Sequence, residues 1–543
     1  MDAYKDILTR AINANKKREF YSQYPEHHKA YPEPWFEIGK EAHASNLNGY
    51  FKGLEFGKNV DWIGEEVSPV NLKPLGIKYP AHDSKNLIRN ALSVKTELKN
   101  VPIETRAQVL IDALERIKIR FFEIAFATIH TTGQSFMMAF QASGPHASDR
   151  ALEAIATAYQ ELTRYNSDVS WEKPMGKSSI TLKKEFKPIP KGVALAIGCS
   201  TFPVWNSVPA IFANIMCGNP VIAKPHPSAI LPIAIVVSEI QNALNAARIS
   251  RKVVQLAIDT SNNPITKKLA ENANIKVIDY TGGNEFGNYI ESLKGKTIFT
   301  EKSAINSVIL DSVNELPAVI DNLAFAAVLY SGQMCTSPQN IFISEKGVKT
   351  KERVVGYSEV IEMFLQSVKQ IIENPKIGPG TLASIQNENC FSRVKGVYHS
   401  GAKVLLEPSK GERGRTCTPL IVELKNSNKE LITTEHFGPI VKIIKTVSLD
   451  DSLSIAKNNA EQNGAITCLV HCTDPNLKTK IKSEMEEVFT PVSFNLTGYF
   501  WVNQHAAFSD FHVTGGNPAG NASFTDANFV NQRFVWVGHR EMV

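Results

Sequence analysis

The chain has 543 residues, of which 43% are hydrophobic, and this length and composition predict a globular protein of two to four domains. Its 59 lysines and arginines exceed its 54 aspartates and glutamates, giving a net charge of +5, but these charges are scattered rather than gathered in a basic stripe. We therefore expect neither nucleic acid nor a membrane surface as a partner.

The cysteine content and the N-terminus both indicate a cytoplasmic protein. Seven cysteines, an odd number, are spread thinly through the chain, which is typical of reduced thiols in a reducing compartment. The first residues, MDAYKDILTRAINANKKREF, lack the apolar core and the small-residue cleavage site of a signal peptide. Residues 192–223 carry no charge, but glycines and prolines divide them into short pieces, so no membrane span is predicted.

Strand and helix patterns alternate from residue 192 to residue 280. Apolar runs predict strands at 192–197, 220–224, 252–258 and 275–280, and the stretches between them predict helices at 203–216, 227–248 and 264–272. Four strands alternating with helices predict a parallel, doubly wound α/β sheet. Such sheets bind ligands at the carboxyl ends of their strands, so the residues that follow each strand are the first candidates for a site.

Three of these strand ends carry suggestive residues: GCSTFP follows the first strand, KPHP the second and TGGNEFG the fourth. Gly282 and Gly283 stand between a strand and a helix, where bare backbone N–H groups can receive a phosphate, although a Gly-Gly pair is more often only a tight turn. Lys224 is either a solvated charge or a buried ammonium that needs an anionic or hydroxyl partner.

Further along, strand-like runs at 297–300 and 306–310 flank Glu301, and a helical pattern runs from Pro317 to Gly332. Cys335 follows immediately, before a strand-like run at 340–344. A single cysteine is usually a small packed hydrophobe. A nucleophilic cysteine needs a base nearby, and Glu301 is the obvious candidate for that base.

Six elements in order, TFPVWN, GNPVIAKP, YTGG, Glu301, SGQMCTSP and TTEHFGPIVKI, resemble the motif series of the aldehyde dehydrogenase superfamily across about residues 100–510. Lys224 follows Thr201 by 23 positions and Cys335 follows Glu301 by 34 positions, as the family pattern requires. The resemblance implies an α/β fold with a Rossmann-type cofactor domain, an α/β catalytic domain and a projecting oligomerisation hairpin.

The resemblance also implies a role for each matched residue. Cys335 would attack an aldehyde to form a thiohemiacetal, a nicotinamide cofactor would take the hydride, and water activated by Glu301 would hydrolyse the thioester. The expected cofactor-binding residues are Lys224 and His226 at the adenosine ribose, Gly282 and Gly283 at the pyrophosphate, and Glu435 and Phe437 at the nicotinamide half. The expected substrate contacts are Phe202, Met334 and Thr336, and no metal is expected.

Two positions depart from the family pattern. The family usually has asparagine, an oxyanion donor, where this chain has Thr201, so oxyanion binding is expected to depend on the Cys335 backbone N–H, with Thr201 or Asn206 as further donors. NAD-preferring members often carry glutamate three residues after the lysine, where this chain has Pro227 beside His226. Without a carboxylate to repel a 2′-phosphate, we expect NADP to be tolerated or preferred, with NAD as the other cofactor.

Two further stretches, SGPHASDRALEAIATAY near residue 143 and the tail VNQHAAFSDFHVTGGNPAGNASFTDANFV, resemble the phenylacetic acid degradation subgroup called PaaN. The resemblance implies aromatic catabolism, with either an aromatic aldehyde or the semialdehyde of a CoA thioester as substrate. Bifunctional relatives carry a hydratase domain after the dehydrogenase; this chain leaves no room for one, so ring hydrolysis is not expected.

The expected domain division follows from the same resemblance. Residues 1–169 and 187–300 would bind the nucleotide, residues 301–504 would form the catalytic domain, and residues 170–186 and 505–543 would serve oligomerisation. SITLKKEF, residues 179–186, alternates apolar and polar residues like an edge strand that pairs with another subunit. We expect a homodimer or a dimer of dimers.

Three alternatives stay open. A CoA-acylating aldehyde dehydrogenase would pass the acyl group to CoA and would not need Glu301. A thiol hydrolase could use Cys335 and Glu301 without a cofactor. A catalytically weak scaffold protein is the third alternative, and the missing asparagine at Thr201 is its only support.

Overall fold

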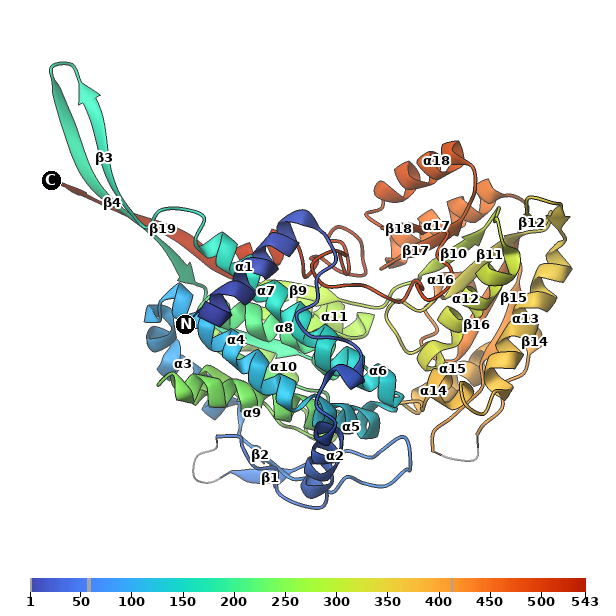
Figure 1. The fold of residues 1–543 in the computed structure, drawn as a ribbon, viewed down its shortest axis with the longest axis horizontal. Coiled ribbons are helices and arrows are strands. Elements are labelled where there is room, and N and C mark those ends of the chain that lie inside the picture. Colours follow the sequence, from blue (N-terminus) through green and yellow to red (C-terminus); the bar gives the residue numbers. More distant parts are fainter. Residues whose placement is uncertain (1, 56–59, 412–413) are drawn as a thin grey trace.

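The computed structural model describes residues 2–55, 60–411 and 414–543, which form two α/β lobes and a projecting β arm (Figure 1). The first lobe contains a five-stranded sheet, the second a seven-stranded sheet and the arm a three-stranded sheet. This arrangement confirms the predicted α/β class. Within the described ranges, no helix is long and apolar enough to cross a membrane.

The sheet of the first lobe has the strand order β7-β6-β5-β8-β9, and every pairing in it is parallel. Its strands are β5 (Val193–Ile197), β6 (Val221–Lys224), β7 (Val254–Leu256), β8 (Ile275–Thr281) and β9 (Thr297–Glu301). The four strands predicted between residues 192 and 280 are all present, and β9 adds a fifth at the edge. Their nearly continuous apolar sequences suit a sheet that is covered on both faces.

Helices cover this sheet and extend its core. The connecting helices are α8 (Pro203–Met216), α9 (Leu231–Ala246), α10 (Thr266–Glu271) and α11 (Asn284–Glu291). The helix predicted at 203–216 is confirmed at both ends, whereas α9 begins only at Leu231, because residues 227–229 form a turn. The charge-free stretch is thus a buried strand, helix and strand, as expected.

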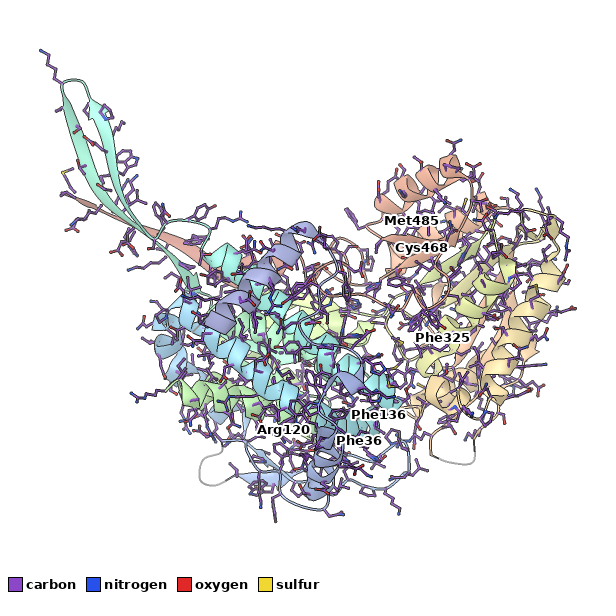
Figure 2. The ribbon with its side chains drawn as sticks, in the orientation of Figure 1. Phe36, Arg120, Phe136, Phe325, Cys468 and Met485 are labelled. Carbon is purple, nitrogen blue, oxygen red and sulfur yellow. The ribbon has the colours of Figure 1, made fainter. Side chains whose placement is uncertain are left out.

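The chain before β5 packs on the same lobe. Its helices are α1 (Asp2–Lys17), α2 (Pro34–Asn46), α3 (Ser84–Asn100), α4 (Ile103–Ile119), α5 (Phe121–Thr132), α6 (Phe136–Gln141) and α7 (Ala147–Leu162), and a two-stranded sheet joins β1 (Asp61–Ile63) to β2 (Tyr79–Ala81). An aromatic cluster connects them: the rings of Phe36 and Phe136 lie 5.4 Å apart (Figure 2). Apolar burial of this kind attaches the N-terminal segment to the lobe.

The second lobe has the strand order β14-β15-β16-β11-β10-β17-β18, with only β14 antiparallel. The strands are β10 (Ser307–Leu310), β11 (Asn340–Ser344), β14 (Lys403–Leu406), β15 (Leu420–Leu424), β16 (Ile440–Thr446), β17 (Cys468–His471) and β18 (Val492–Phe494), with a small hairpin of β12 (Val348–Lys349) and β13 (Val354–Val355). The helices are α12 (Leu316–Val328), α13 (Tyr357–Glu373), α14 (Gly378–Leu382), α15 (Asn389–Tyr398), α16 (Lys429–Thr433), α17 (Leu449–Asn463) and α18 (Pro475–Glu486). Cys468 and Met485 mark one of its two cores (Figure 2).

The arm consists of β3 (Asp168–Met175), β4 (Ser178–Pro190) and the C-terminal strand β19 (Phe534–Met542), in the order β19-β4-β3 (Figure 1). Residues 179–186, which we expected to form an edge strand, instead lie in the central strand. The expectation was wrong because β19 pairs along β4 from Phe534 opposite Pro190 to Met542 opposite Leu182. Alternation of apolar and polar residues shows that the two faces of a strand have different surroundings, but it does not show how many neighbouring strands pair with it.

After β18, residues 495–526 return to the first lobe without regular secondary structure, and α19 (Ala527–Asn531) leads into the arm. Gly520 forms a bridge with Glu301 at the end of β9. The fully buried Arg533 donates two hydrogen bonds to Asp279 of β8, at 2.8 and 2.6 Å. The C-terminal segment is therefore fixed against the first sheet before it reaches the arm.

Candidate active site

The carboxyl edge of the first sheet carries two of the predicted site residues, Lys224 and Glu301. Lys224 stands opposite Ile197 in the pairing of β6 with β5, and Glu301 stands opposite Thr281 in the pairing of β9 with β8. The loops that follow these strands therefore open at the same edge, as the rule for parallel sheets predicts.

Cys335 follows a short turn with an unusual backbone. After α12, Tyr330 and Ser331 have positive φ angles of 52° and 50°, and Gly332 follows with 65°. A side chain on Gly332 would have its Cβ only 2.3 Å from the carbonyl oxygen of Gly438, so a glycine is needed at this close approach. Asn306 then holds the Cys335 carbonyl with a hydrogen bond of 2.7 Å. Non-glycine residues in this conformation are strained and mark a precisely positioned segment.

The Cys335 thiol is partly buried and has two titratable neighbours. Its Sγ lies 3.7 Å from Nε2 of His512, and that nitrogen lies 3.2 Å from Oε1 of Glu301. Burial, and then the Glu301 carboxylate, raise the pKa of Cys335 well above its ordinary value. A thiol in this position needs a partner that takes its proton before it can act as a nucleophile.

Glu301, the last residue of β9, is buried and held through both carboxylate oxygens. Asn206 of α8 donates from Nδ2 to Oε2 at 3.1 Å, while His512 contacts Oε1. The sequence left open whether Asn206 reaches the site; the structure shows that its amide is engaged by Glu301, and its Oδ1 accepts a hydrogen bond from Cys199 at 3.5 Å.

Thr201 lies in the loop between β5 and α8, where its backbone carbonyl accepts a hydrogen bond of 2.8 Å from Gln134. This bond ties the loop to the N-terminal helices of the first lobe. The role of the Thr201 hydroxyl as an oxyanion donor stays a prediction.

Lys224 is buried and forms an ion pair with Asp259, which follows β7, at 2.7 Å. Sequence spacing showed Pro227 in place of the usual glutamate but could not show a carboxylate supplied by another strand end. Glu65 also lies near enough to favour the charged forms of Lys224 and His226. Burial and the Lys224 charge lower the pKa of His226 to about 4, so its imidazole is neutral at neutral pH.

The glycine pair stands at the start of α11. The N–H of Gly282 donates to the Glu301 carbonyl at 3.0 Å, whereas Gly283 is the residue before the helix, and no atom lies within 4 Å of a Cβ added to it. Open space in front of a helix N-terminus fits a phosphate group. With the Lys224 ammonium at the same sheet edge, these residues fit a dinucleotide cofactor.

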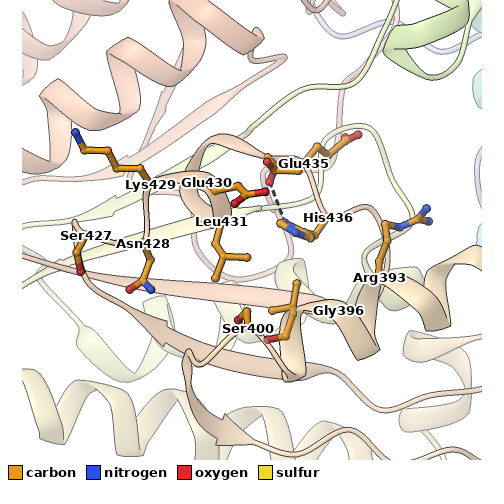
Figure 3. Close-up of a pocket in the computed structure, with 12 residues that line it drawn as sticks. Arg393, Gly396, Ser400, Ser427, Asn428, Lys429, Glu430, Leu431, Glu435 and His436 are labelled. Carbon is orange, nitrogen blue, oxygen red and sulfur yellow. Dashed lines mark hydrogen bonds between the residues drawn. The ribbon is translucent and has the colours of Figure 1, made fainter.

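Glu435 and Phe437 lie on a loop before β16, in the second lobe. Glu435 accepts a hydrogen bond from the Ala304 N–H at 3.3 Å, and burial raises the pKa of its carboxyl group. A cavity of about 640 Å³ adjoins this loop (Figure 3); among its lining residues are Arg393, Gly396, Ser400, Leu431, Glu435 and His436. Its lining includes Glu435 but neither Cys335 nor Glu301, so the cavity borders one expected cofactor residue rather than the expected reacting groups.

The three expected substrate contacts differ in their surroundings. Phe202 and Met334 pack into one apolar cluster with Tyr330 and Trp205. Thr336 is buried, and its hydroxyl donates to the Asn503 carbonyl at 3.3 Å. The hydroxyl therefore faces the backbone of the C-terminal segment rather than the apolar cluster.

The side-chain atoms of Glu301, Cys335 and His512 all lie within 4.8 Å of one another, a spacing that a metal ion would also accept. The sequence-based expectation was that no metal takes part. We assign none, and that expectation stays a prediction.

Sequence reasoning missed His512 and Asp259 as site residues. His512 lies in the C-terminal tail, which we expected, as part of residues 505–543, to serve oligomerisation. The structure shows that the first part of this segment also reaches the site. An unusual histidine-containing tail, NQHAAFSDFH, was the signal that could have identified it.

Comparison with known proteins agrees with this geometry. The model of the aldehyde dehydrogenase family matches residues 66–519. The lactaldehyde dehydrogenase of Methanocaldococcus jannaschii is 25% identical over 439 residues, which cover 78% of this chain and 88% of that protein.

Solved structures show the same relationship. The crystal structure of an NAD-dependent aldehyde dehydrogenase from Burkholderia multivorans matches with a TM-score of 0.96 and 37% identity, covering 99% of this chain and 98% of that chain. The glyceraldehyde-3-phosphate dehydrogenase GapN of M. jannaschii, complexed with NADP, shares the fold at a TM-score of 0.71 and 21% identity over 89% of this chain and 100% of that chain. The chain thus belongs to the aldehyde dehydrogenase family and is an NAD(P)-dependent enzyme that oxidises aldehydes to acids.

Proposed function

We propose that this enzyme oxidises its aldehyde on Cys335 and releases the acid by hydrolysis with Glu301 as the base. The observation that carries this proposal is the position of the Glu301 carboxylate within 4.8 Å of the Cys335 thiol, at the carboxyl edge of the cofactor sheet. A carboxylate at this place can take the proton of an attacking water, whereas the more acidic thiol of CoA does not need such a base, so it favours water over CoA as the acyl acceptor.

In this mechanism, the Cys335 thiolate attacks the aldehyde carbon and forms a thiohemiacetal. Oxidation of that carbon requires a hydride acceptor, which bound NAD or NADP would supply. The thioester left on Cys335 is attacked by a water whose proton passes to Glu301, and the tetrahedral intermediate collapses to the acid and the thiolate. Lys224 and Gly283 would hold the adenosine and phosphate parts of the cofactor, with His226 and Gly282 beside them.

Stabilisation of the oxyanion is the part of the mechanism in which this chain departs from its family. Asn206 already donates to Glu301, so the Cys335 backbone N–H and the Thr201 hydroxyl are the proposed donors. On the nicotinamide side, Glu435 and Phe437 take the proposed roles at the ribose and the ring.

For the cofactor, we favour NAD over NADP. The carboxylates of Asp259 and Glu65 near Lys224 disfavour a 2′-phosphate, since like charges at close range repel. The similar enzyme from Burkholderia multivorans is described as NAD-dependent.

For the substrate, we propose an aromatic aldehyde or the semialdehyde of a CoA thioester, in phenylacetate-type catabolism. The apolar cluster that contains Phe202 and Met334 supports an apolar acyl group, and the resemblance of the tail to the PaaN subgroup supports this pathway. Thr336 would shape the substrate site indirectly, by holding the backbone of Asn503 with its hydrogen bond.

For assembly, we propose a cytoplasmic homodimer or dimer of dimers that pairs through the arm. In the part of the chain that the structure describes, β3 and β19 are the two edge strands of the arm, and the outer side of an edge strand can pair with a strand of another subunit.

Replacement of Glu301 tests the mechanism. Glu301→Gln should still produce about one equivalent of reduced cofactor per active site in a rapid burst, followed by turnover about 100-fold slower or more, because hydrolysis lacks its base. Cys335→Ala should show neither phase, and Glu285→Gln, an exposed change on α11, should behave as wild type. Full steady-state turnover in Glu301→Gln, or turnover in Cys335→Ala, would contradict the assigned roles.

A panel of aldehydes, each with NAD and NADP and with and without CoA, tests the substrate, the cofactor preference and the acyl acceptor. The proposal expects acid formation without CoA and faster turnover with NAD. Strict dependence on CoA would instead identify a CoA-acylating enzyme.

A further inference from the structure

His512 contacts both reacting groups of the site, yet the mechanism above assigns it no role. Its Nε2 lies 3.7 Å from the Cys335 sulfur and 3.2 Å from Oε1 of Glu301. Its side chain is almost completely buried, so these contacts are not those of a mobile surface residue.

The protein holds this imidazole from several sides. The Trp205 ring meets it edge to face at 4.5 Å, and the Phe524 ring stacks on it at 5.7 Å. Two residues of its segment, Phe508 and Val513, have positive φ angles of 67° and 58°. Strained backbone of this kind persists only where the surrounding contacts demand it.

A buried ion pair anchors the same segment to α7. Arg150 and Glu153, 1% and 0% exposed, lie 2.8 Å apart. Arg150 donates to the carbonyls of His505 and Asp510, and Glu153 accepts from the N–H of Phe508 at 2.6 Å. Burying two charges is costly unless they are paired and hydrogen-bonded, and the bonds of Arg150 and Glu153 to this segment position the stretch that carries His512.

The second nitrogen of His512 faces another imidazole. Nδ1 of His512 and Nδ1 of His505 lie 3.1 Å apart, and only one of them can carry the hydrogen between them. Burial, then His512 and Arg150, lower the pKa of His505 well below its ordinary value, so His505 is neutral. A neutral His512 has two tautomers here. With its hydrogen on Nδ1, donated to Nδ1 of His505, the lone pair of Nε2 can receive the thiol proton; with its hydrogen on Nε2, that nitrogen donates to the Glu301 carboxylate.

A proton acceptor is needed at this place. The titratable and charged groups around His512 come from β9, from the turn after α12, from α7 and from its own segment: Glu301, Cys335, Arg150, Glu153, His505 and Asp510. A Cys335 thiolate would form beside the Glu301 carboxylate, an unfavourable pairing of like charges. An imidazolium at His512, between the sulfur and the carboxylate, would stabilise both anions.

We propose that His512 is a catalytic residue that takes the proton of the Cys335 thiol, and that His505 is a positioning residue that selects the tautomer of His512. This inference rests on the proposed role of Cys335 as the nucleophile.

The step balances without an external reactant. The S–H bond breaks and the proton moves to Nε2 of His512, while the sulfur electron pair forms the bond to the aldehyde carbon and the carbonyl π pair moves to oxygen. The imidazolium then donates from Nε2 to Glu301 and from Nδ1 to His505. When the thioester is hydrolysed, the departing thiolate recovers its proton from His512.

Alkylation of Cys335 by iodoacetamide, followed by mass spectrometry of its peptide from pH 6 to 10, tests the proposal without substrate or cofactor. Wild-type enzyme should react readily at pH 7. His512→Gln has an amide that can still hydrogen-bond to Glu301 but cannot take a proton. Its alkylation at pH 7 should be slower than that of wild type by a factor of about ten or more, and the rate should recover only at alkaline pH. His505→Gln should stay close to wild type, and His505→Leu should shift the profile in the direction of His512→Gln.

Glu301→Gln is the matched comparison, because Glu301 is the other group that could take the proton. It should keep the neutral-pH alkylation within about threefold. Loss of that reaction in Glu301→Gln but not in His512→Gln would assign the proton to Glu301 and overturn the proposal.

Two further measurements serve as controls for the proposed role of His512. Added imidazole should restore alkylation to His512→Ala at pH 7, and no rescue in a variant with a wild-type thermal melt would count against the proposal. Cys335→Ser tests the underlying assumption separately: if it still oxidised aldehydes, the nucleophile assignment would fail whatever the alkylation profile of His512→Gln.

Discussion

Glu301 illustrates how single residues decide the chemistry of this site. Each of its two carboxylate oxygens has one side-chain partner, Asn206 on one side and His512 on the other. Together they keep the carboxylate beside Cys335 rather than letting it turn away. Thr201 stands where the family motif usually has asparagine, and the nearby Asn206 donates its amide hydrogen bond to the Glu301 carboxylate.

Asn206→Ala should lower kcat about 10- to 100-fold with little change in KM, because a hydrogen bond to a charged group contributes about 1.5–3 kcal/mol. Steady-state kinetics measure this effect. Asn214→Ala is the control: Asn214 is also buried on α8 but donates to Asp279 at 3.0 Å, so this variant should lose stability and keep its kcat. Equal losses of kcat in Asn206→Ala and Asn214→Ala would mean that Asn206 affects catalysis only through the stability of α8.

Among the elements, β16 shows how a strand positions a site loop. Lys442, fully buried in the middle of β16, donates two hydrogen bonds of 2.8 Å to the carbonyls of Leu431 and Thr434. Leu431 lies in α16 and Thr434 immediately precedes Glu435, so the strand holds the loop that carries an expected cofactor residue. Burial lowers the pKa of the Lys442 ammonium to about 7.

This pKa has a consequence for stability. Between about pH 7 and the ordinary lysine pKa of about 10.4, the unfolded chain binds a proton that the folded chain does not, so the free energy of unfolding rises with pH. Melts at pH 7, 8 and 9 should therefore show wild type gaining stability relative to Lys442→Met. Lys442→Met also leaves two carbonyls unpaired and lowers stability at every pH, so the slope is the test. Parallel curves would refute the lowered pKa.

For the whole molecule, the C-terminal segment links three parts of the structure. Residues 495–533 leave the second lobe, bring His512 to the reacting groups and fix Arg533 to the first sheet; β19 then completes the arm (Figure 1). The site and the proposed assembly surface therefore depend on one continuous stretch of chain.

A chain that ends at Phe534 tests the role of the arm. Without residues 535–543, β4 loses nearly all of its pairing with β19, so the arm should no longer hold a second subunit. Size-exclusion chromatography with light scattering should show a smaller particle, whereas removal of Val543 alone should leave the mass unchanged. An unchanged mass for the longer deletion would place the subunit interface elsewhere.

Local patterns were sufficient for much of the fold. Apolar runs of strand length and the glycines and prolines between them predicted β5, β6, β7 and β8, and the helix 203–216 was predicted at both ends, because these features depend on neighbours within a few residues. The central position of β4 could not be predicted, since its partner β19 lies at the other end of the chain.

By itself, the sequence determined the α/β class, the order of the family motifs and the pairing of Cys335 with Glu301. Only the tertiary structure decided which other groups reach them. Asn206 and His512 are 95 and 211 positions from Glu301, and Asp259 reaches Lys224 from a different strand end. Such contacts follow from how strands are ordered and where the returning C-terminal segment packs, and no local periodicity records that information.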